Sequence, residues 1–282
     1  MVASIEHELR SAGADWTTTL ARSLVEMEGA VRQAVAAERQ VWIGGGDGTV
    51  RDVLDGMAAN RGAVAGIVPL GTVNALARAL GTPLQPAAAA RWLLDAIPRP
   101  MDTGEVGGRV FYCFASIGWD AAAVHAVRPA EKRILGRGAY LVGALRAVSR
   151  LRPPARFGAE IQPHDAPGNV IHDAGHSLIV SNIPCYAGHT IFHRAAPCSG
   201  SMELFLFRGG NPLTGLGWCA AQSLRRAPEP ARWNVADLLV SRFSVRSRLP
   251  MHLQLDGDPV SIGDNTAYEF TVRPASVRIL CR

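Results

Sequence analysis

The first hundred residues alternate between helix-like and strand-like patterns of hydrophobic positions. Two short apolar runs, Val41–Ile43 and Ala63–Val68, each end at glycine or proline, as is typical of buried strands. Apolar residues recur at helical spacing in four other stretches, which we predict as helices: 20–38, 50–57, about 73–80 and 87–96. Strands and helices that alternate in this way predict a parallel α/β sheet.

After about residue 103 the pattern becomes one of short strands separated by turn residues. We predict strands at 110–115, 177–181, 202–207, 243–246, 252–255, 268–272 and 276–281. Helices are predicted near 131–150 and 212–226, and a loop around 173–175. The expected fold class is therefore α/β plus β. An α/β domain would span 1–102 and a mainly β domain 103–282, whose last residues can return to the first domain.

Composition narrows the classes of protein that this chain can belong to. Its 282 residues are 48% hydrophobic, which is too apolar for a disordered chain. No run of 18 apolar residues occurs, and the acidic start does not resemble a signal peptide, so we expect a cytoplasmic protein. Five scattered cysteines without a CxxC motif are expected to be buried free thiols. The eight histidines show no metal-ligand spacing.

A glycine-rich segment follows the first predicted strand. Gly45-Gly46-Asp47-Gly48-Thr49 lies where that strand gives way to a helix. Consecutive amides in such a turn form an anion site, and the helix dipole adds to it. Asp47 would repel a phosphate unless it handles a cation or a proton, which favours Mg²⁺–nucleotide chemistry. The alternative is an ordinary strand-to-helix turn, because the segment is neither a Walker loop nor GxGxxG.

A second loop of the same kind follows the next predicted strand. It reads Pro69-Leu70-Gly71-Thr72-Val73-Asn74 and opens another helix. Adjacent parallel strands bring two such loops to the same carboxyl edge, where α/β sheets bind ligands. Thr72 and Asn74 can contact a ribose or a base, although helix capping alone also explains them.

Together these motifs resemble the catalytic domain of the diacylglycerol kinase family. GGDGT followed about 20 residues later by PLGTxNxxAR is most similar to the soluble bacterial lipid kinases, which are related to sphingosine and ceramide kinases. Other segments resemble further family motifs in the same order: 51–56 (NEVVNG), 118–121 (GFDA), 135–140 (LGRxAY), 181–182 with 186–188 (N…YYGG), and 255–258 (DGE). The ordered combination is more specific than any single motif.

The resemblance implies both a fold and a reaction. The fold is an α/β nucleotide-binding domain, shared with NAD kinases, followed by a mainly β sandwich domain, with the active site in the cleft. The reaction is ATP- and Mg²⁺-dependent phosphorylation of a lipid hydroxyl, on a diacylglycerol-like or sphingoid-like substrate. The resemblance also implies roles for individual residues: phosphate binding by Gly45, Gly46, Gly48 and Thr49; nucleotide binding by Gly71, Thr72 and Asn74; phosphate and metal contact by Asp47; general base by Asp256; and acceptor or metal positioning by Asp120.

The sequence departs from the family pattern at several positions. The usual first strand and its NPxSG loop have no match at the start of this chain. Ser199 stands where the family has an Asp that supports a structural Mg²⁺, so the site for this second metal lacks that ligand. Asp258 replaces a Glu, and Ala75 replaces a frequent Asp. Two alternatives stay open: an NAD kinase, which shares GGDGT and a related fold, and a non-catalytic relative that binds nucleotide or lipid, which the missing first strand and Ser199 suggest.

The charge distribution bears on partners. Residues 128–156 hold eight basic residues against only Glu131, on a segment with amphipathic spacing. This pattern suits an anionic membrane surface, where a lipid substrate resides, although a solvated basic face is the simpler alternative. The charge comes without interleaved aromatic residues, so we expect no nucleic-acid partner. A sheet edge left open by the absent first strand would favour a homodimer.

Overall fold

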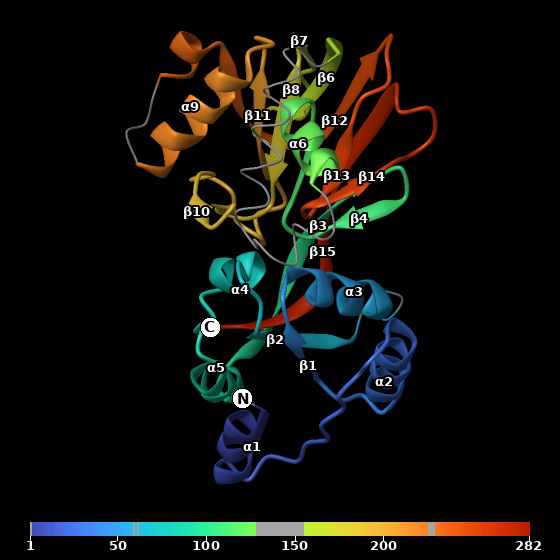
Figure 1. The fold of residues 1–282 in the computed structure, drawn as a ribbon, viewed down its shortest axis with the longest axis vertical. Coiled ribbons are helices and arrows are strands. Elements are labelled where there is room, and N and C mark those ends of the chain that lie inside the picture. Colours follow the sequence, from blue (N-terminus) through green and yellow to red (C-terminus); the bar gives the residue numbers. More distant parts are fainter. Residues whose placement is uncertain (1, 59, 61, 128–154, 225–228) are drawn as a thin grey trace. The chain divides into compact units, whose positions relative to one another are not determined.

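In a computed structural model, the described residues are 2–58, 60, 62–127, 155–224 and 229–282. The chain divides into two compact units. Unit 1 comprises residues 1–101 and 275–282, and unit 2 comprises residues 102–274. Figure 1 labels the elements in chain order. Among the described residues, no helix is both long enough and apolar enough to cross a membrane.

Unit 1 is built on parallel strands. Strand β1 (Val41–Gly45) pairs in parallel with β2 (Val64–Pro69), and β2 pairs in parallel with the end of β15 (Ala267–Cys281). Both β1 and β2 are apolar runs, as expected for strands that are covered on both faces. The helices of this unit are α1 (Val2–Ser11), α2 (Leu24–Ala36), α3 (Asp47–Met57), α4 (Ala75–Ala79) and α5 (Pro86–Leu94).

The helices of unit 1 pack through one apolar face each. Helix α3 buries Val50, Val53, Leu54 and Met57, which share a face at helical spacing. Helix α5 begins at Pro86, a favoured first position, and contributes Leu93 to a core shared with β2 and β15. This packing fixes the carboxyl ends of β1 and β2, where α3 and the segment leading to α4 begin.

Unit 2 contains a large antiparallel sheet. The order through its centre is β15–β12–β11–β8–β5–β13–β14, with β6 and β7 joined beside β12. The strands that this unit contributes to the sheet are the second part of β3 (Ile97–Val106), β4 (Arg109–Phe111), β5 (Phe114–Ile117), β6 (Phe157–Pro163), β7 (Ile171–Gly175), β8 (Ser177–Ser181), β11 (Met202–Phe207), β12 (Val235–Ser247), β13 (Leu253–Leu255), β14 (Asp258–Val260) and the first part of β15. Strands β9 (Cys185–Tyr186) and β10 (His189–Thr190) form a separate two-stranded sheet. Helices α6 (Trp119–Ala126) and α9 (Pro212–Ser223) and a 3₁₀ turn (Pro230–Trp233) complete unit 2.

The central strands of unit 2 are buried on both faces. Along β11, Leu204 and Leu206 join one apolar cluster, whereas Phe205 and Phe207 join another. This alternation follows from the two-residue period of a strand. The second cluster includes Trp218 of α9, so that helix covers this face of the sheet (Figure 1).

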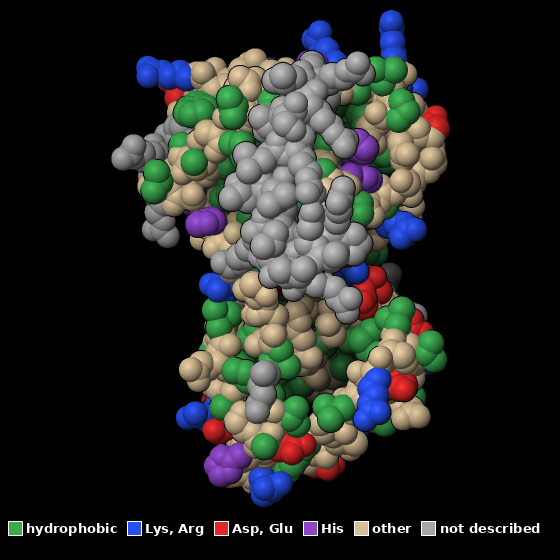
Figure 2. Space-filling view, in the orientation of Figure 1, with side chains coloured by type: hydrophobic (Ala, Val, Ile, Leu, Met, Phe, Trp, Pro, Cys, Tyr) green, Lys and Arg blue, Asp and Glu red, His purple; other side chains and the backbone are tan. Residues whose placement is uncertain are grey.

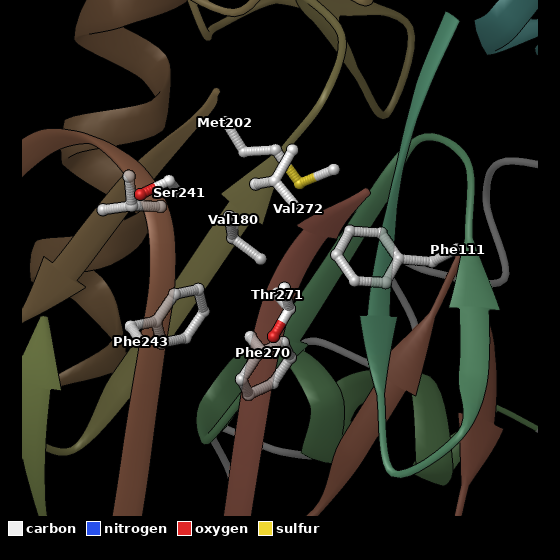
Figure 3. Close-up of a pocket in the computed structure, with 9 residues that line it drawn as sticks. Phe111, Val180, Met202, Ser241, Phe243, Phe270, Thr271 and Val272 are labelled. Carbon is white, nitrogen blue, oxygen red and sulfur yellow. The ribbon is translucent and has the colours of Figure 1, made fainter. Parts of the chain in front are cut away.

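The first cluster surrounds a small apolar pocket (Figure 3). Its lining residues are Phe111, Val180, Met202, Val240, Ser241, Phe243, Phe270, Thr271 and Val272. Its cavity volume is about 10 Å³, which is no more than the roughly 10–15 Å³ that a single water molecule needs. As it stands, the pocket is therefore part of the packed core.

The structure confirms the expected fold class and corrects several details. The loop predicted around 173–175 is wrong, because these residues belong to β7, a polar strand that pairs with β6. Strand β6 was not predicted, and β15 joins two predicted strands into one. Cys113, Cys185 and Cys281 are buried as expected, whereas Cys219 is partly buried and Cys198 is exposed. The predicted helix at 131–150, with its LGRxAY-like motif, and most of the basic segment lie outside the described residues.

Candidate functional site

The two glycine-containing loops of unit 1 lie directly against each other. The amide of Leu70 donates a hydrogen bond of 2.9 Å to the carbonyl oxygen of Gly45. A Cβ atom added to Gly71 would lie 2.5 Å from the Cα of Gly46, so a side chain at position 71 cannot be accommodated without a shift. The expected common edge at the ends of β1 and β2 is present.

Asp47 joins these two loops. It is the first residue of α3, and its Oδ1 accepts a hydrogen bond of 2.6 Å from the amide of Ala75, the first residue of α4. Burial raises the pKa of Asp47, and hydrogen bonds from backbone amides partly offset this effect. The carboxylate therefore acts as a cap on α4, which the sequence reasoning did not foresee.

Asn74 has a different place from the one expected. Its backbone is left-handed, with φ of 51°, and its side chain is buried. Its Oδ1 accepts a hydrogen bond from the amide of Gly71 at 2.9 Å, and its Nδ2 donates one to the carbonyl oxygen of Gly71 at 2.8 Å. Asn74 thus shapes the loop. Gly48, Thr49 and Thr72 are exposed, so a ligand can reach them.

Asp256 lies in unit 2, in the two-residue turn between β13 and β14. Both Asp256 and Gly257 have positive φ, as a type I′ hairpin turn requires. The hairpin explanation of this Asp-Gly pair is therefore correct, but it is incomplete. Oδ2 of Asp256 accepts a hydrogen bond from the amide of Tyr112 at 2.8 Å. Oδ1 accepts two more, from the amides of Cys113 at 2.8 Å and Phe114 at 3.0 Å.

Asn182 contacts the same turn as Asp256. This fully buried side chain donates from Nδ2 to the carbonyl oxygens of Asp102, at 2.8 Å, and Tyr112, at 3.0 Å. The backbone amide of Asn182 donates a hydrogen bond of 2.8 Å to the carbonyl oxygen of Cys113. Asp256 and Asn182 therefore hold the 112–114 turn between them, which fixes the orientation of the Asp256 carboxylate.

Asp120 is buried in unit 2, in the first turn of α6. Its carboxylate accepts short hydrogen bonds from the hydroxyl groups of Ser116 and Tyr186, and Gln254 Nε2 lies 3.4 Å away. Burial raises the pKa of Asp120, and these hydrogen bonds oppose the increase. Gln254 also accepts a hydrogen bond from the amide of Gly257 at 2.8 Å. A polar chain thus connects Asp120 to the turn that carries Asp256.

The turn around Ser199 tests whether the structural Mg²⁺ of the resemblance fits this chain. The hydroxyl of Ser199 lies 2.9 Å from the carbonyl oxygen of Ala196 and 3.0 Å from that of Ser201. A neutral hydroxyl that donates to these carbonyls replaces the carboxylate that a cation would need. Among the described residues, no group of three or more His, Cys, Asp or Glu is arranged to hold a metal ion. The structural metal therefore does not fit here.

The sequence analysis did not single out the neighbouring carboxyl groups of Glu203 and Asp237. Glu203 is buried on β11, and its Oε2 accepts hydrogen bonds from the amides of Arg194, at 2.7 Å, and Ala195, at 2.9 Å. Burial, reinforced by the neighbouring Asp237, raises the pKa of Glu203 to about 7. The only sequence signal was one acidic residue inside an otherwise apolar strand.

Comparison with known proteins connects this chain to relatives along most of its length. Residues 1–106 match the diacylglycerol kinase catalytic domain. A probable lipid kinase YegS-like protein of Pseudomonas fluorescens Pf-5 is 32% identical over 288 residues, covering 96% of this chain and 87% of the relative. The corresponding protein of Pseudomonas putida KT2440 is 35% identical over 265 residues, covering 88% and 79%.

Solved structures agree with this relationship at the level of the fold. A candidate diacylglycerol kinase from Bacillus anthracis Sterne has a TM-score of 0.78 at 18% identity, covering 100% of this chain and 91% of that one. A second structure, of a diacylglycerol kinase from the same strain, has a TM-score of 0.70 at 15% identity, covering 98% and 91%. The chain belongs to the diacylglycerol kinase catalytic-domain family, and it is a kinase.

Proposed function

We propose that this kinase transfers the γ-phosphoryl group of ATP to the hydroxyl group of a lipid, with Mg²⁺ as the accompanying cation. The observation that carries the proposal is the joined pair of loops in unit 1. There the Asp47 carboxylate contacts Ala75, beside the exposed residues Gly48, Thr49 and Thr72. Amides at the start of an α-helix suit the phosphates of a nucleotide.

We propose that the carboxylate of Asp47 would bind this Mg²⁺. Mg²⁺ in nucleotide sites is usually held by one or two protein carboxylates, and phosphate oxygens and water complete its coordination. One carboxylate that also accepts a backbone hydrogen bond fits this mode, because an ionised carboxyl group offers about four lone-pair positions. When bound, the cation would neutralise charge on the phosphates.

The acceptor side of the reaction is assigned to unit 2. In the transfer, the lipid oxygen forms a bond to the γ-phosphorus, and the bond between this phosphorus and the bridging oxygen of the ADP leaving group breaks. The hydroxyl proton must pass to a base, for which we propose Asp256. Three backbone amides hold its carboxylate in a fixed orientation, which suits a base that must meet the acceptor hydroxyl. We further propose that Asp120 helps to place the acceptor.

The lipid class of the acceptor rests on the relatives, which are named probable lipid kinases. Diacylglycerols and sphingoid bases both carry a primary hydroxyl beside a long apolar chain. Both remain candidate substrates under the proposal.

The test is transfer of radiolabelled γ-phosphate from ATP, with Mg²⁺, to a panel of lipid alcohols in mixed micelles. NAD serves as a parallel acceptor, and the Asp256→Asn variant as the negative control. A labelled lipid formed by the unmodified protein and not by the variant supports the proposal and names the substrate class. Label in NAD alone would point instead to an NAD kinase. ATP binding without any labelled product would overturn the proposal in favour of a binding protein.

A further inference from the structure

Helix α9 presents an apolar stripe to solvent on its outer side. Leu213, Leu216, Ala220 and Leu224 are all exposed, and their spacing of three, four and four residues places them on one face of the helix and its last turn. Leu213 and Leu224 are 61% and 65% exposed. Residues 212–224 contain no charged side chain and no histidine. Hydrophobic side chains are visible over α9 in Figure 2.

The inner side of the same helix is also apolar and is closely packed. A Cβ atom on Gly215 would lie 2.2 Å from the Trp119 ring, and one on Gly217 would lie 2.6 Å from the Trp233 ring. Trp218 is fully buried in the same aromatic cluster. A helix that is hydrophobic on all sides is normally buried on all sides. The exposed stripe of α9 is therefore a surface that another apolar phase would cover.

The inner side of α9 also lies beside the proposed acceptor residue. Trp119, which Gly215 contacts, is the neighbour of Asp120 on α6, and the charge of Asp120 acts on the thiol of Cys219 in α9. The indole N–H groups of Trp119 and Trp218 are buried and have no hydrogen-bond partner within the described part of the chain. One face of α9 thus packs against the part of unit 2 that carries Asp120, while the opposite face exposes apolar side chains to solvent.

We infer that the stripe Leu213–Leu216–Ala220–Leu224 docks on the surface of a lipid bilayer, with its leucines inserted among the acyl chains. This inference rests on the proposed function, because a lipid acceptor resides in a bilayer and must be reached there. Insertion of an uncharged face depends on buried apolar area and not on anionic lipid. Docking through α9 therefore differs from attraction through basic residues, since salt would weaken only the latter.

The test is sedimentation with vesicles of pure phosphatidylcholine in the absence of ATP. Leu213→Gln and Leu224→Gln are combined in one variant. Leu249→Gln and Val170→Gln form the matched control, because Leu249 is 63% exposed and Val170 is 55% exposed, both outside α9. We expect the α9 variant to bind at least about tenfold more weakly than the unmodified protein, because two inserted side chains are lost. The control variant and salt of about 0.5 M should leave binding nearly unchanged.

Three results would overturn the inference. The first is that the unmodified protein fails to bind these vesicles. The second is that the α9 variant binds as well as the control variant. The third is that light scattering shows the α9 substitutions converting a dimer to a monomer. The last result would mean that a second copy of the chain covers the stripe. Equal unfolding temperatures of the two variants establish that both are folded. Because the assay contains no ATP, it is independent of whether the kinase proposal succeeds, which the labelling experiment decides.

Discussion

The carboxylate of Asp47 accepts a hydrogen bond of 2.6 Å from the amide of Ala75, which lies 28 residues further along the chain. This bond ties the start of α3 to the start of α4, the two helices that follow adjacent parallel strands. Asp47 is thus part of the architecture of the loops and, under the proposed function, also part of their chemistry. Substitutions at this position can separate the two contributions.

We predict that Asp47→Asn and Asp47→Ala differ in stability but lose turnover alike. Asparagine retains an oxygen that can accept the Ala75 amide, and it removes a charge that burial disfavours. Its free energy of unfolding should therefore change by less than about 0.5 kcal/mol. Alanine removes the cap and should cost about 1 kcal/mol. If Asp47 handles the cation, both variants should lose about 100-fold or more in turnover.

Denaturant unfolding and the labelling assay together decide the matter. An Asp47→Asn protein that turns over normally would show that the charge is not needed, and that Asp47 is only a cap. An Asp47→Asn protein as unstable as Asp47→Ala would instead show that the hydrogen bond requires an ionised acceptor.

Asp256→Asn is predicted to abolish turnover while ATP binding persists. The amide group cannot take the acceptor proton, so the loss should be about 100-fold or more in turnover. ATP binding, measured by calorimetry, should be little changed, because the proposed nucleotide loops belong to unit 1. Near-normal turnover would show that Asp256 is not the base.

Because Asp256 also holds the 112–114 turn, its variant needs a structural control. Asn182→Ala removes the other side chain that bonds to this turn and leaves the carboxylate in place. We expect it to lower stability by roughly 1–3 kcal/mol, because buried carbonyl oxygens lose their donor. Turnover below the unfolding transition should fall much less than in Asp256→Asn. An equal fall would show that Asp256 acts only by shaping the turn.

The sequence predicted the α/β part of this fold well because its signals are local. Buried parallel strands are continuous apolar runs, and a glycine or a proline marks where each one ends, as at Gly45 and Pro69. The same approach missed β6 and misread β7 as a loop. Strand β7 is polar and partly exposed, so its pairing depends on partners distant in the chain rather than on its own pattern. Strand β6 does carry a local signal, because buried Phe157, Ala159 and Ile161 alternate with outward positions, and the sequence analysis overlooked it.

The candidate residues could be found from motifs, but their contacts could not. Asn74 was expected to contact the nucleotide, with helix capping as the alternative. Its side chain instead bonds to Gly71, and the side-chain cap on α4 comes from Asp47. A carboxylate that reaches a helix 28 residues away leaves no periodic trace in the sequence. Glu203 was missed for a related reason, because a single acid in an apolar strand shows its importance only when burial and neighbours are known.

The pKa of Glu203, raised from 4.5 to about 7, predicts a specific dependence of stability on pH. Between these values the folded state keeps a proton that the unfolded chain releases. The free energy of unfolding should therefore fall as the pH rises from about 4.5 to about 7, by an amount on the order of 1–3 kcal/mol. Glu203→Gln cannot titrate and should lack this decrease.

Urea unfolding from pH 4.5 to 8 tests this prediction. The stability advantage of Glu203→Gln over the unmodified protein should grow with pH and become constant above about pH 7. The exposed Glu160→Gln is the matched control and should follow the unmodified protein throughout. An advantage independent of pH would show that Glu203 does not retain its proton on folding.

Gly48→Ala separates stability from nucleotide binding most sharply. Gly48 is the second residue of α3, and a Cβ atom there would have no atom within 4 Å. The protein alone should therefore accept alanine, with a gain in stability of up to about 1 kcal/mol from helix propensity. If phosphates approach this backbone, as proposed, the added methyl group should weaken ATP binding by about tenfold or more.

Gly29→Ala, in α2, is the matched control, because its Cβ would also be unobstructed and no ligand is proposed there. Calorimetric titration with ATP should thus show weaker binding for Gly48→Ala alone. Equal affinities of the two variants for ATP would show that the phosphates do not contact this loop.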